Sequence, residues 1–245
     1  MYKIRLVFGR VFSLYNLKNS YIYNIIYIES EKGVNKMDFP SRQTIHEVAQ
    51  VLNEWGITDF FKGTYKQNSN RFNVWCLELS KNTNLKVSNG CTKIVVKFGD
   101  DCWVIKIPYK TQINYCHREA ENYARAHKAH LTNFFAPCYF YGVIDEIPIY
   151  LQRLVDKEDS TITSECWNFA YSNNPQEEEE TDEDYADRIS SYVENDMDDY
   201  EVVEAIIGEN RKLFDFIYEN DINDLHKGNF GYLNDAPVIF DYSGF

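Results

Sequence analysis

The sequence has no long hydrophobic run. None of its apolar stretches reaches the roughly 18 residues that a membrane-spanning helix needs. The N-terminal stretch LVFGRVFSLY is interrupted by Arg10 and lacks the small-residue cleavage site of a secretory signal peptide. We therefore expect a cytoplasmic protein without membrane partners.

Clustered cysteines are also missing. The six cysteines are scattered, with no Cys-x-x-Cys pair and no histidine at ligand spacing; they are Cys76, Cys91, Cys102, Cys116, Cys138 and Cys166. A disulfide framework or a zinc site needs tighter clustering than this. We expect reduced, mostly buried thiols.

Positive charge is scarce, and the deficit is local. The chain has a formal net charge of −13, with 25 Lys and Arg against 38 Asp and Glu. Residues 177–201 hold thirteen of the acids and one arginine, so the rest is close to neutral. Because the chain has no broad basic surface that could bind a phosphate backbone, we expect no direct nucleic-acid binding. The acidic run indicates a solvated, partly disordered insertion or, alternatively, a docking surface for a basic protein.

The remaining composition is typical of a globular protein. Apolar residues make up 44% and charged residues 26% of the 245 residues, which is enough chain to bury a core without disulfides. The first 36 residues are aromatic and mildly basic, and include a strand-like run at 21–28. Either they form an added element, or the biological start is Met37.

Helical and strand-like patterns follow one another after this extension. Apolar steps of three and four predict a helix between Ser41 and Gly56, with Thr44 and Glu47 as a capping box. Two further helices are predicted, at 113–130 and at 201–220, the second despite Gly208. Strands are predicted at 72–79, 93–98, 102–107, 138–144 and 147–154, and the tail reads as short strands and turns. Hairpins are expected to join the strands at 93–98 and 102–107, through residues 99–101, and those at 138–144 and 147–154.

The strongest chemical pattern lies near the C-terminal end, in DLHKGN at 224–229 and IFDYSG at 239–244. An Asp, an Asn five residues later and a second Asp after a short hairpin are groups that phosphoryl transfer from a nucleotide needs. One carboxylate can orient or deprotonate the acceptor hydroxyl. The amide oxygen and the other carboxylate can hold Mg²⁺ against the phosphates, because a hard cation prefers oxygen ligands.

These two motifs resemble the catalytic loop and metal-binding motif of the protein kinase-like superfamily, most closely its aminoglycoside phosphotransferase branch. The resemblance implies that Asp224 is the catalytic base, Asn229 a metal ligand and Asp241 the main Mg²⁺ ligand. The sequence departs from the family at Ile222, where a mainly architectural histidine is usual.

The superfamily also has a lysine on its third strand, and Lys106 ends the apolar run CWVIK. A buried lysine is costly unless something pairs with it. A nucleotide phosphate and a glutamate on the next helix would do so. Glu119 is the expected partner, and Glu121, on a different helix face, is the alternative; the resemblance makes Lys106 and Glu119 part of the catalytic machinery.

The nucleotide-binding residues follow from the same resemblance. Ser88, Gly90 and Lys93 occupy the place of the glycine-rich loop, although this loop has one glycine where the family usually has two or three. Gln152 and Leu154 lie where the hinge would contact adenine. Together with Lys106, these residues form the expected ATP site.

The expected fold is α+β, a kinase-like two-lobe fold with a mostly antiparallel N-lobe sheet plus a helix and a much reduced C-lobe. The expected parts are an extension at 1–40, a helix and N-lobe at 41–155, the acidic insertion at 156–200 and a truncated C-lobe at 201–245. In ending soon after the metal-binding Asp, the chain resembles compact kinase-like proteins encoded by bacteriophages, which would place it in the host cytoplasm.

Two functions follow from these observations. The first is an ATP- and Mg²⁺-dependent phosphotransferase that acts on a protein or a small hydroxyl compound. The alternative is a catalytically inactive kinase-like binding module, such as a phage inhibitor that grips a basic host protein with its acidic segment. Retention of the polar catalytic positions favours the enzyme.

Overall fold

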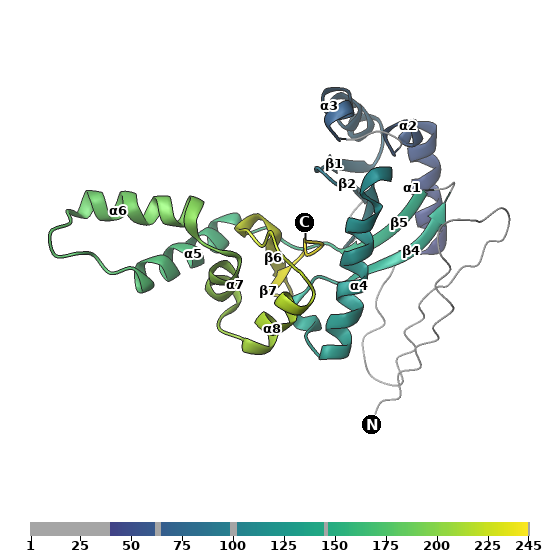
Figure 1. Cartoon of the computed structure of the whole chain (residues 1–245). Coiled ribbons are helices and arrows are strands. Elements are labelled where there is room, and N and C mark those ends of the chain that lie inside the picture. The colour runs from purple at the N-terminus through teal and green to yellow at the C-terminus, as the bar shows by residue number, and fades with distance from the viewer. Residues whose placement is uncertain (1–39, 62–64, 99–101, 145–146, 245) are drawn as a thin grey trace.

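The computed structural model describes residues 40–61, 65–98, 102–144 and 147–244 (Figure 1). The α-helices are α1 (Arg42–Glu54), α2 (Ile57–Phe61), α3 (Tyr65–Asn82), α4 (Ile113–Ala129), α5 (Asp159–Asn173), α6 (Asp182–Ser191), α7 (Asp199–Ile207) and α8 (Arg211–Glu219). The strands are β1 (Leu85–Asn89), β2 (Lys93–Phe98), β3 (Trp103–Pro108), β4 (Cys138–Ile144), β5 (Ile147–Arg153), β6 (Phe230–Leu233) and β7 (Ala236–Ile239). The expected extension with its strand at 21–28 lies outside the described residues. No helix in the described ranges is both long and apolar enough to cross a membrane.

Five strands form one antiparallel sheet in the order β1-β2-β3-β5-β4. Strands β6 and β7 form a separate antiparallel hairpin. The predictions of an α+β fold and of strands at 93–98, 138–144 and 147–154 are confirmed. Strands β2 and β3 pair as the predicted hairpin requires, and its connection at 99–101 lies outside the described residues.

The two faces of the sheet have different neighbours, because successive side chains of a strand point to opposite faces. On β3, Trp103, Ile105 and Ile107 belong to a core that also contains buried residues of α1, α2 and α3. Lys106 lies on the opposite face, where it meets Glu119 of α4. The sheet is therefore covered on both sides, and its α4 side carries the charged groups of the site.

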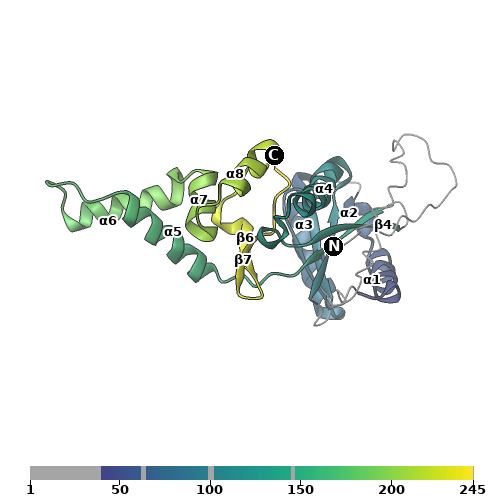
Figure 2. The ribbon, with the colours of Figure 1, turned by 90° about the horizontal axis from the view of Figure 1, so that it is seen from below.

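A second core lies beyond α4 and is built from helices α5 to α8 and the β6–β7 hairpin. Figures 1 and 2 show this part at the other end of an elongated molecule, with α5 and α6 projecting from it as an arm. Residues of α4 such as Tyr123 and Ala126 contribute to this second core. Helix α4 thus connects the two cores.

Residues 72–79, predicted as a strand, lie within helix α3. Phe72, Trp75, Cys76 and Leu79 are buried against the sheet, at steps of three and four residues. The run FNVWCLEL also alternates in places, and the short window hid the helical period. The prediction of a strand here is wrong.

Two further details of the helices differ from expectation. Ser41, rather than Thr44, caps α1: its hydroxyl accepts the N–H of Thr44 at 3.0 Å. The single helix predicted at 201–220 is two helices, since Gly208 adopts a φ of +94° and Asn210 starts α8 by accepting the N–H of Leu213. A glycine in that conformation ends a helix at low steric cost.

Much of the acidic segment is helical. Thr181 caps α6, and Asp182, Glu183 and Asp184 occupy the first turn, where the helix dipole favours negative charge. Asp198 and Glu201 form a capping box that starts α7. Much of the acidic run therefore serves to begin helices. Ile162, Cys166 and Ala170 of α5, four residues apart, anchor the arm in the second core.

Candidate functional site

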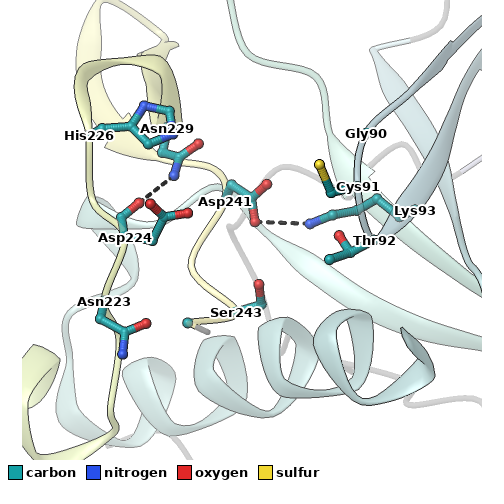
Figure 3. Close-up of a pocket in the computed structure, with 11 residues that line it drawn as sticks. Gly90, Cys91, Thr92, Lys93, Asn223, Asp224, His226, Asn229, Asp241 and Ser243 are labelled. Atoms are coloured by element: carbon teal, nitrogen blue, oxygen red, sulfur yellow. Dashed lines mark hydrogen bonds and ion pairs between the residues drawn. The ribbon is translucent and has the colours of Figure 1, made fainter. Parts of the chain in front are cut away.

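A pocket lies between the β1–β2 hairpin and the segments that flank the β6–β7 hairpin (Figure 3). It contains about 550 Å³ of empty space, including part that is open to solvent. The lining residues are Gly90, Cys91, Thr92, Lys93, Asn223, Asp224, His226, Asn229, Asp241, Ser243 and Gly244. The loop at 90–93 and the two C-terminal motifs thus contribute to one concave site.

Four charged side chains meet at the inner wall of this pocket. Lys106 donates to one carboxylate oxygen of Glu119 at 2.6 Å, and Lys93 contacts the other oxygen. Lys93 also donates to Asp241 Oδ1 at 2.9 Å. Glu119 has no exposed surface, while Lys93 and Lys106 are 5% and 3% exposed. Two ammonium groups thus balance two carboxylates within a largely buried cluster.

Strand register explains why two lysines reach one glutamate. Val95 of β2 lies opposite Lys106 of β3, so both side chains are on the same face of the sheet. Lys93 is two residues before Val95 and shares that face, which makes it a diagonal neighbour of Lys106. Glu119 projects from α4 toward both. Glu121 is about half exposed and pairs with His117 at 3.3 Å, so Glu119 is the partner of Lys106.

The cluster shifts the pKa values of its members. Burial alone would lower the pKa of Lys93, but Glu119 and Asp241 outweigh it and raise that pKa well above its ordinary value. Burial would raise the pKa of Asp241, but Lys106 and Lys93 hold it well below its usual range. Burial raises the pKa of Glu119, and the two lysines offset part of that effect. Asp241 is therefore a carboxylate at neutral pH.

The main chain around Asp241 is fixed on both sides. Gln152 and Lys106 donate to the carbonyl oxygen of Phe240 at 2.7 and 3.3 Å. Asn122, one helical turn after Glu119 on α4, donates to the carbonyl oxygen of Tyr242 at 3.0 Å. Strand β5 and helix α4 therefore place the Asp241 carboxylate at the pocket wall with little freedom.

The loop at 222–229 supplies the opposite wall. Asp224 has a φ of +61°, uncommon for a residue other than glycine and frequent at functional sites. Asn229 Nδ2 donates to the main-chain carbonyl of Asp224 at 2.6 Å, which fixes the amide and leaves its oxygen available. Leu225 N–H donates to Asp199 at 2.9 Å and ties the loop to α7. Figure 3 shows Asp224 and Asp241 extending into the pocket from one side and Lys93 reaching Asp241 from the other.

Some predicted site residues come together and others do not. Asp224, Asn229, Asp241, Gly90 and Lys93 line the pocket. Lys106 and Glu119 lie directly behind it, in the buried cluster.

Three predicted nucleotide contacts fall outside the lining: Ser88, Gln152 and Leu154. Ser88 is exposed on β1, Gln152 is turned toward Phe240, and the Leu154 N–H donates to the carbonyl of Cys102. The Gln152 side chain holds the carbonyl of Phe240, the residue before Asp241.

Some contributors to the site are not predictable from the sequence pattern. Lys93 was expected in the phosphate loop, but its shared contact with Glu119 and its bond to Asp241 were not. Asn122 was missed as well, although its position three residues after Glu119 puts it on the same helix face. Ile222 is buried in the second core and serves as an apolar anchor of the loop.

Comparison with known proteins found no match for this chain: no family model matches it, and neither a curated protein nor a solved structure does.

Proposed function

We propose that this protein is an ATP- and Mg²⁺-dependent phosphotransferase with a kinase-like two-lobe fold, acting on a protein or small hydroxyl acceptor. The observation that carries the proposal is the meeting of Lys93 with Asp241, 148 positions later in the chain, in a pocket that Asp224 and Asn229 also line. A chance Asp-x4-Asn pattern has no reason to lie opposite a buried lysine–glutamate pair.

The residues at this pocket fit a magnesium ion bound together with phosphates. Asn229 Oδ1 and the ionised Asp241 carboxylate are hard oxygen donors, and both line the pocket. In the described part of the chain, no three His, Cys, Asp or Glu side chains form a metal-binding group of their own. Magnesium sites commonly use only one or two protein carboxylates, and water and substrate phosphates complete the coordination shell. When bound, the ion would neutralise charge on the phosphate oxygens.

The chain's own groups have distinct roles in the proposed reaction. Asp224, exposed at the pocket wall, would take the proton of the acceptor hydroxyl as the acceptor oxygen bonds to the γ-phosphorus. The bond from that phosphorus to the bridging oxygen would break, and ADP would leave. Lys106, held by Glu119 directly behind the pocket lining, would add positive charge that favours bound phosphates without contacting them.

The test separates nucleotide binding from catalysis. Melting temperatures are measured with ATP, with and without Mg²⁺, for wild type, Asp241→Ala, Asp224→Asn and the control Asp235→Asn. Asp235 is exposed in the β6–β7 turn, outside the pocket lining. Bound ligand raises the melting temperature by mass action, so no acceptor is needed. We expect a Mg²⁺-dependent rise in wild type, Asp224→Asn and Asp235→Asn, and its loss in Asp241→Ala. No rise for wild type at millimolar ATP contradicts the proposal.

A second candidate is a kinase-like module that binds a partner without transferring phosphate. The observation in its favour is the arm of α5 and α6, which projects from the second core and exposes much of the acidic run (Figure 2). A basic protein is the partner that such a surface fits. Under this function, Asp224→Asn and Asp241→Asn leave the biological effect intact, while charge-neutralising changes in α6 remove it.

A further inference from the structure

Lys93 holds the carboxylate that the proposed function assigns to the metal. Its ammonium group donates to Asp241 Oδ1 at 2.9 Å, and Asp241 is the charged ligand expected for Mg²⁺. A divalent cation and an ammonium group cannot both occupy contact distance on the same side of that carboxylate, because their like charges repel. Binding of a divalent cation at Oδ1 therefore requires Lys93 to move.

The contacts of the two lysines differ in a way that permits this movement. Lys106 bonds Glu119 at 2.6 Å and the Phe240 carbonyl at 3.3 Å, and it does not line the pocket. Lys93 lines the pocket and contacts the other carboxylate oxygen of Glu119, so this carboxylate has a second ammonium partner in Lys106. If Lys93 left, Glu119 would keep one ammonium partner in its buried position. The cluster thus has one structural lysine and one that it can release.

The space and the backbone also favour a movement of the side chain alone. The Lys93 main chain is fixed by the β2–β3 pairing and by the Gly90 N–H, which donates to the Lys93 carbonyl at 2.9 Å. The side chain has four flexible bonds and borders the open volume of the pocket. Asp241, with 34% of its side chain exposed, faces the same volume.

We propose that Lys93 is a displaceable counter-ion, which neutralises Asp241 in the ligand-free pocket and transfers its ammonium group to phosphate oxygens when a divalent cation takes Asp241. This inference rests on the proposed function for the identity of its ligand. It adds a coupling between metal and phosphate: each makes room for the other by drawing Lys93 to a new partner.

The test measures metal and nucleotide binding separately. Mn²⁺ replaces Mg²⁺ as the probe, because free Mn²⁺ is counted directly by its electron paramagnetic resonance signal. Lys93→Met removes the ammonium group and keeps the length of the side chain, whereas Lys93→Arg keeps the charge. Lys97→Met is the matched control, since Lys97 lies on the same face of β2 but outside the pocket.

We expect Lys93→Met to bind Mn²⁺ alone at least about tenfold more tightly than wild type, because the competing charge is gone. Lys93→Arg and Lys97→Met should bind it as wild type does, and Lys93→Met/Asp241→Asn should lose the gain. By calorimetry, Lys93→Met should bind Mg²⁺–ATP about tenfold more weakly than wild type, because it lacks the phosphate partner. Unchanged or weaker Mn²⁺ binding by Lys93→Met overturns the inference.

A measurement on wild type guards against a variant that does not fold. In protein labelled with ¹⁵N-lysine, added Mg²⁺ must shift the Lys93 Nζ resonance. This resonance is assigned by its absence from the Lys93→Arg spectrum. An unshifted resonance overturns the inference.

The two proposals fail separately. If Mg²⁺–ATP does not bind wild type but Lys93→Met gains Mn²⁺ affinity, the phosphotransferase is wrong and the displaceable ion pair stands. If Mg²⁺–ATP binds through Asp241 and Lys93→Met gains no Mn²⁺ affinity, the reverse holds.

Discussion

Replacing Glu119 with glutamine removes one negative charge from a side chain that has no exposed surface. The substitution keeps the shape, so it creates no cavity. In wild type, the carboxylates of Glu119 and Asp241 balance Lys93 and Lys106. In Glu119→Gln, Asp241 alone faces two ammonium groups that are almost fully buried. One positive charge is then left without compensation.

The expected loss of stability follows from buried ion pairs measured in other proteins. Removing one partner of a buried ion pair typically lowers the free energy of unfolding by about 3–5 kcal/mol, because the other charge stays desolvated. Glu121→Gln is the matched control on the same helix. Glu121 is about half exposed and 3.3 Å from His117, and exposed pairs contribute at most about 1 kcal/mol.

Urea unfolding at pH 7 gives both values on one scale. We expect a loss of about 3–5 kcal/mol for Glu119→Gln and of less than about 1 kcal/mol for Glu121→Gln. The charge-balanced double variant Glu119→Gln/Lys93→Met should recover part of the loss. If Glu119→Gln is as stable as Glu121→Gln, the four groups do not form the buried charged cluster that the site requires.

Two further predictions concern the wall around Asp241. The lowered pKa of folded Asp241 contributes stability that is present above the unfolded value of about 3.9 and is lost as the pH falls toward the folded value. The difference in unfolding free energy between wild type and Asp241→Asn should therefore be constant from pH 7 to 5 and shrink between pH 5 and 3. Urea titrations at each pH measure this difference. A difference that grows on acidification contradicts the lowered pKa of Asp241. Gly244 has a φ of +67°, and a Cβ there would meet the carbonyl oxygen of Asp221. Gly244→Ala should lower the unfolding free energy by about 1–3 kcal/mol, whereas Gly90→Ala, whose Cβ would lie 3.9 Å from its nearest neighbour, should change it by less than about 0.5 kcal/mol; equal effects would contradict the backbone argument.

The sequence predicted the elements whose composition is distinctive over their whole length. Helix α4 contains neither glycine nor proline, and strands β2, β4 and β5 each lie in a short apolar run. The run at 72–79 failed because eight residues with Phe72, Val74 and Cys76 also fit alternation. Only the continuation of the helix from Tyr65 makes the three- and four-residue steps decisive.

The candidate site was predictable as a list of chemical groups and not as a network. Asp224, Asn229 and Asp241 stand close together in sequence, and a short hairpin returns the chain to its start. The sharing of Glu119 by Lys93 and Lys106 depends on the register between β2 and β3, which single-sequence patterns do not specify. Gln152 shows the same limit, because its contact with the Phe240 carbonyl joins two segments 88 positions apart.

The acidic run has local structure that its composition does not specify. Thr181 and Asp198 each cap a helix whose first turn is acidic. The position of the acids relative to a capping residue is the feature that indicates where such a helix begins.

Transfer of the γ-phosphate is the measurement that tests the central claim most directly. Protein and radiolabelled ATP are incubated with Mg²⁺, with water, small alcohols and mixed proteins as acceptors, and with Asp224→Asn and Asp235→Asn in parallel. The account predicts transfer by wild type and by Asp235→Asn, its loss on chelation of Mg²⁺, and at least a hundredfold (~10²) slower transfer by Asp224→Asn. Transfer that is absent from wild type with every acceptor, or that Asp224→Asn performs at the wild-type rate, would contradict it.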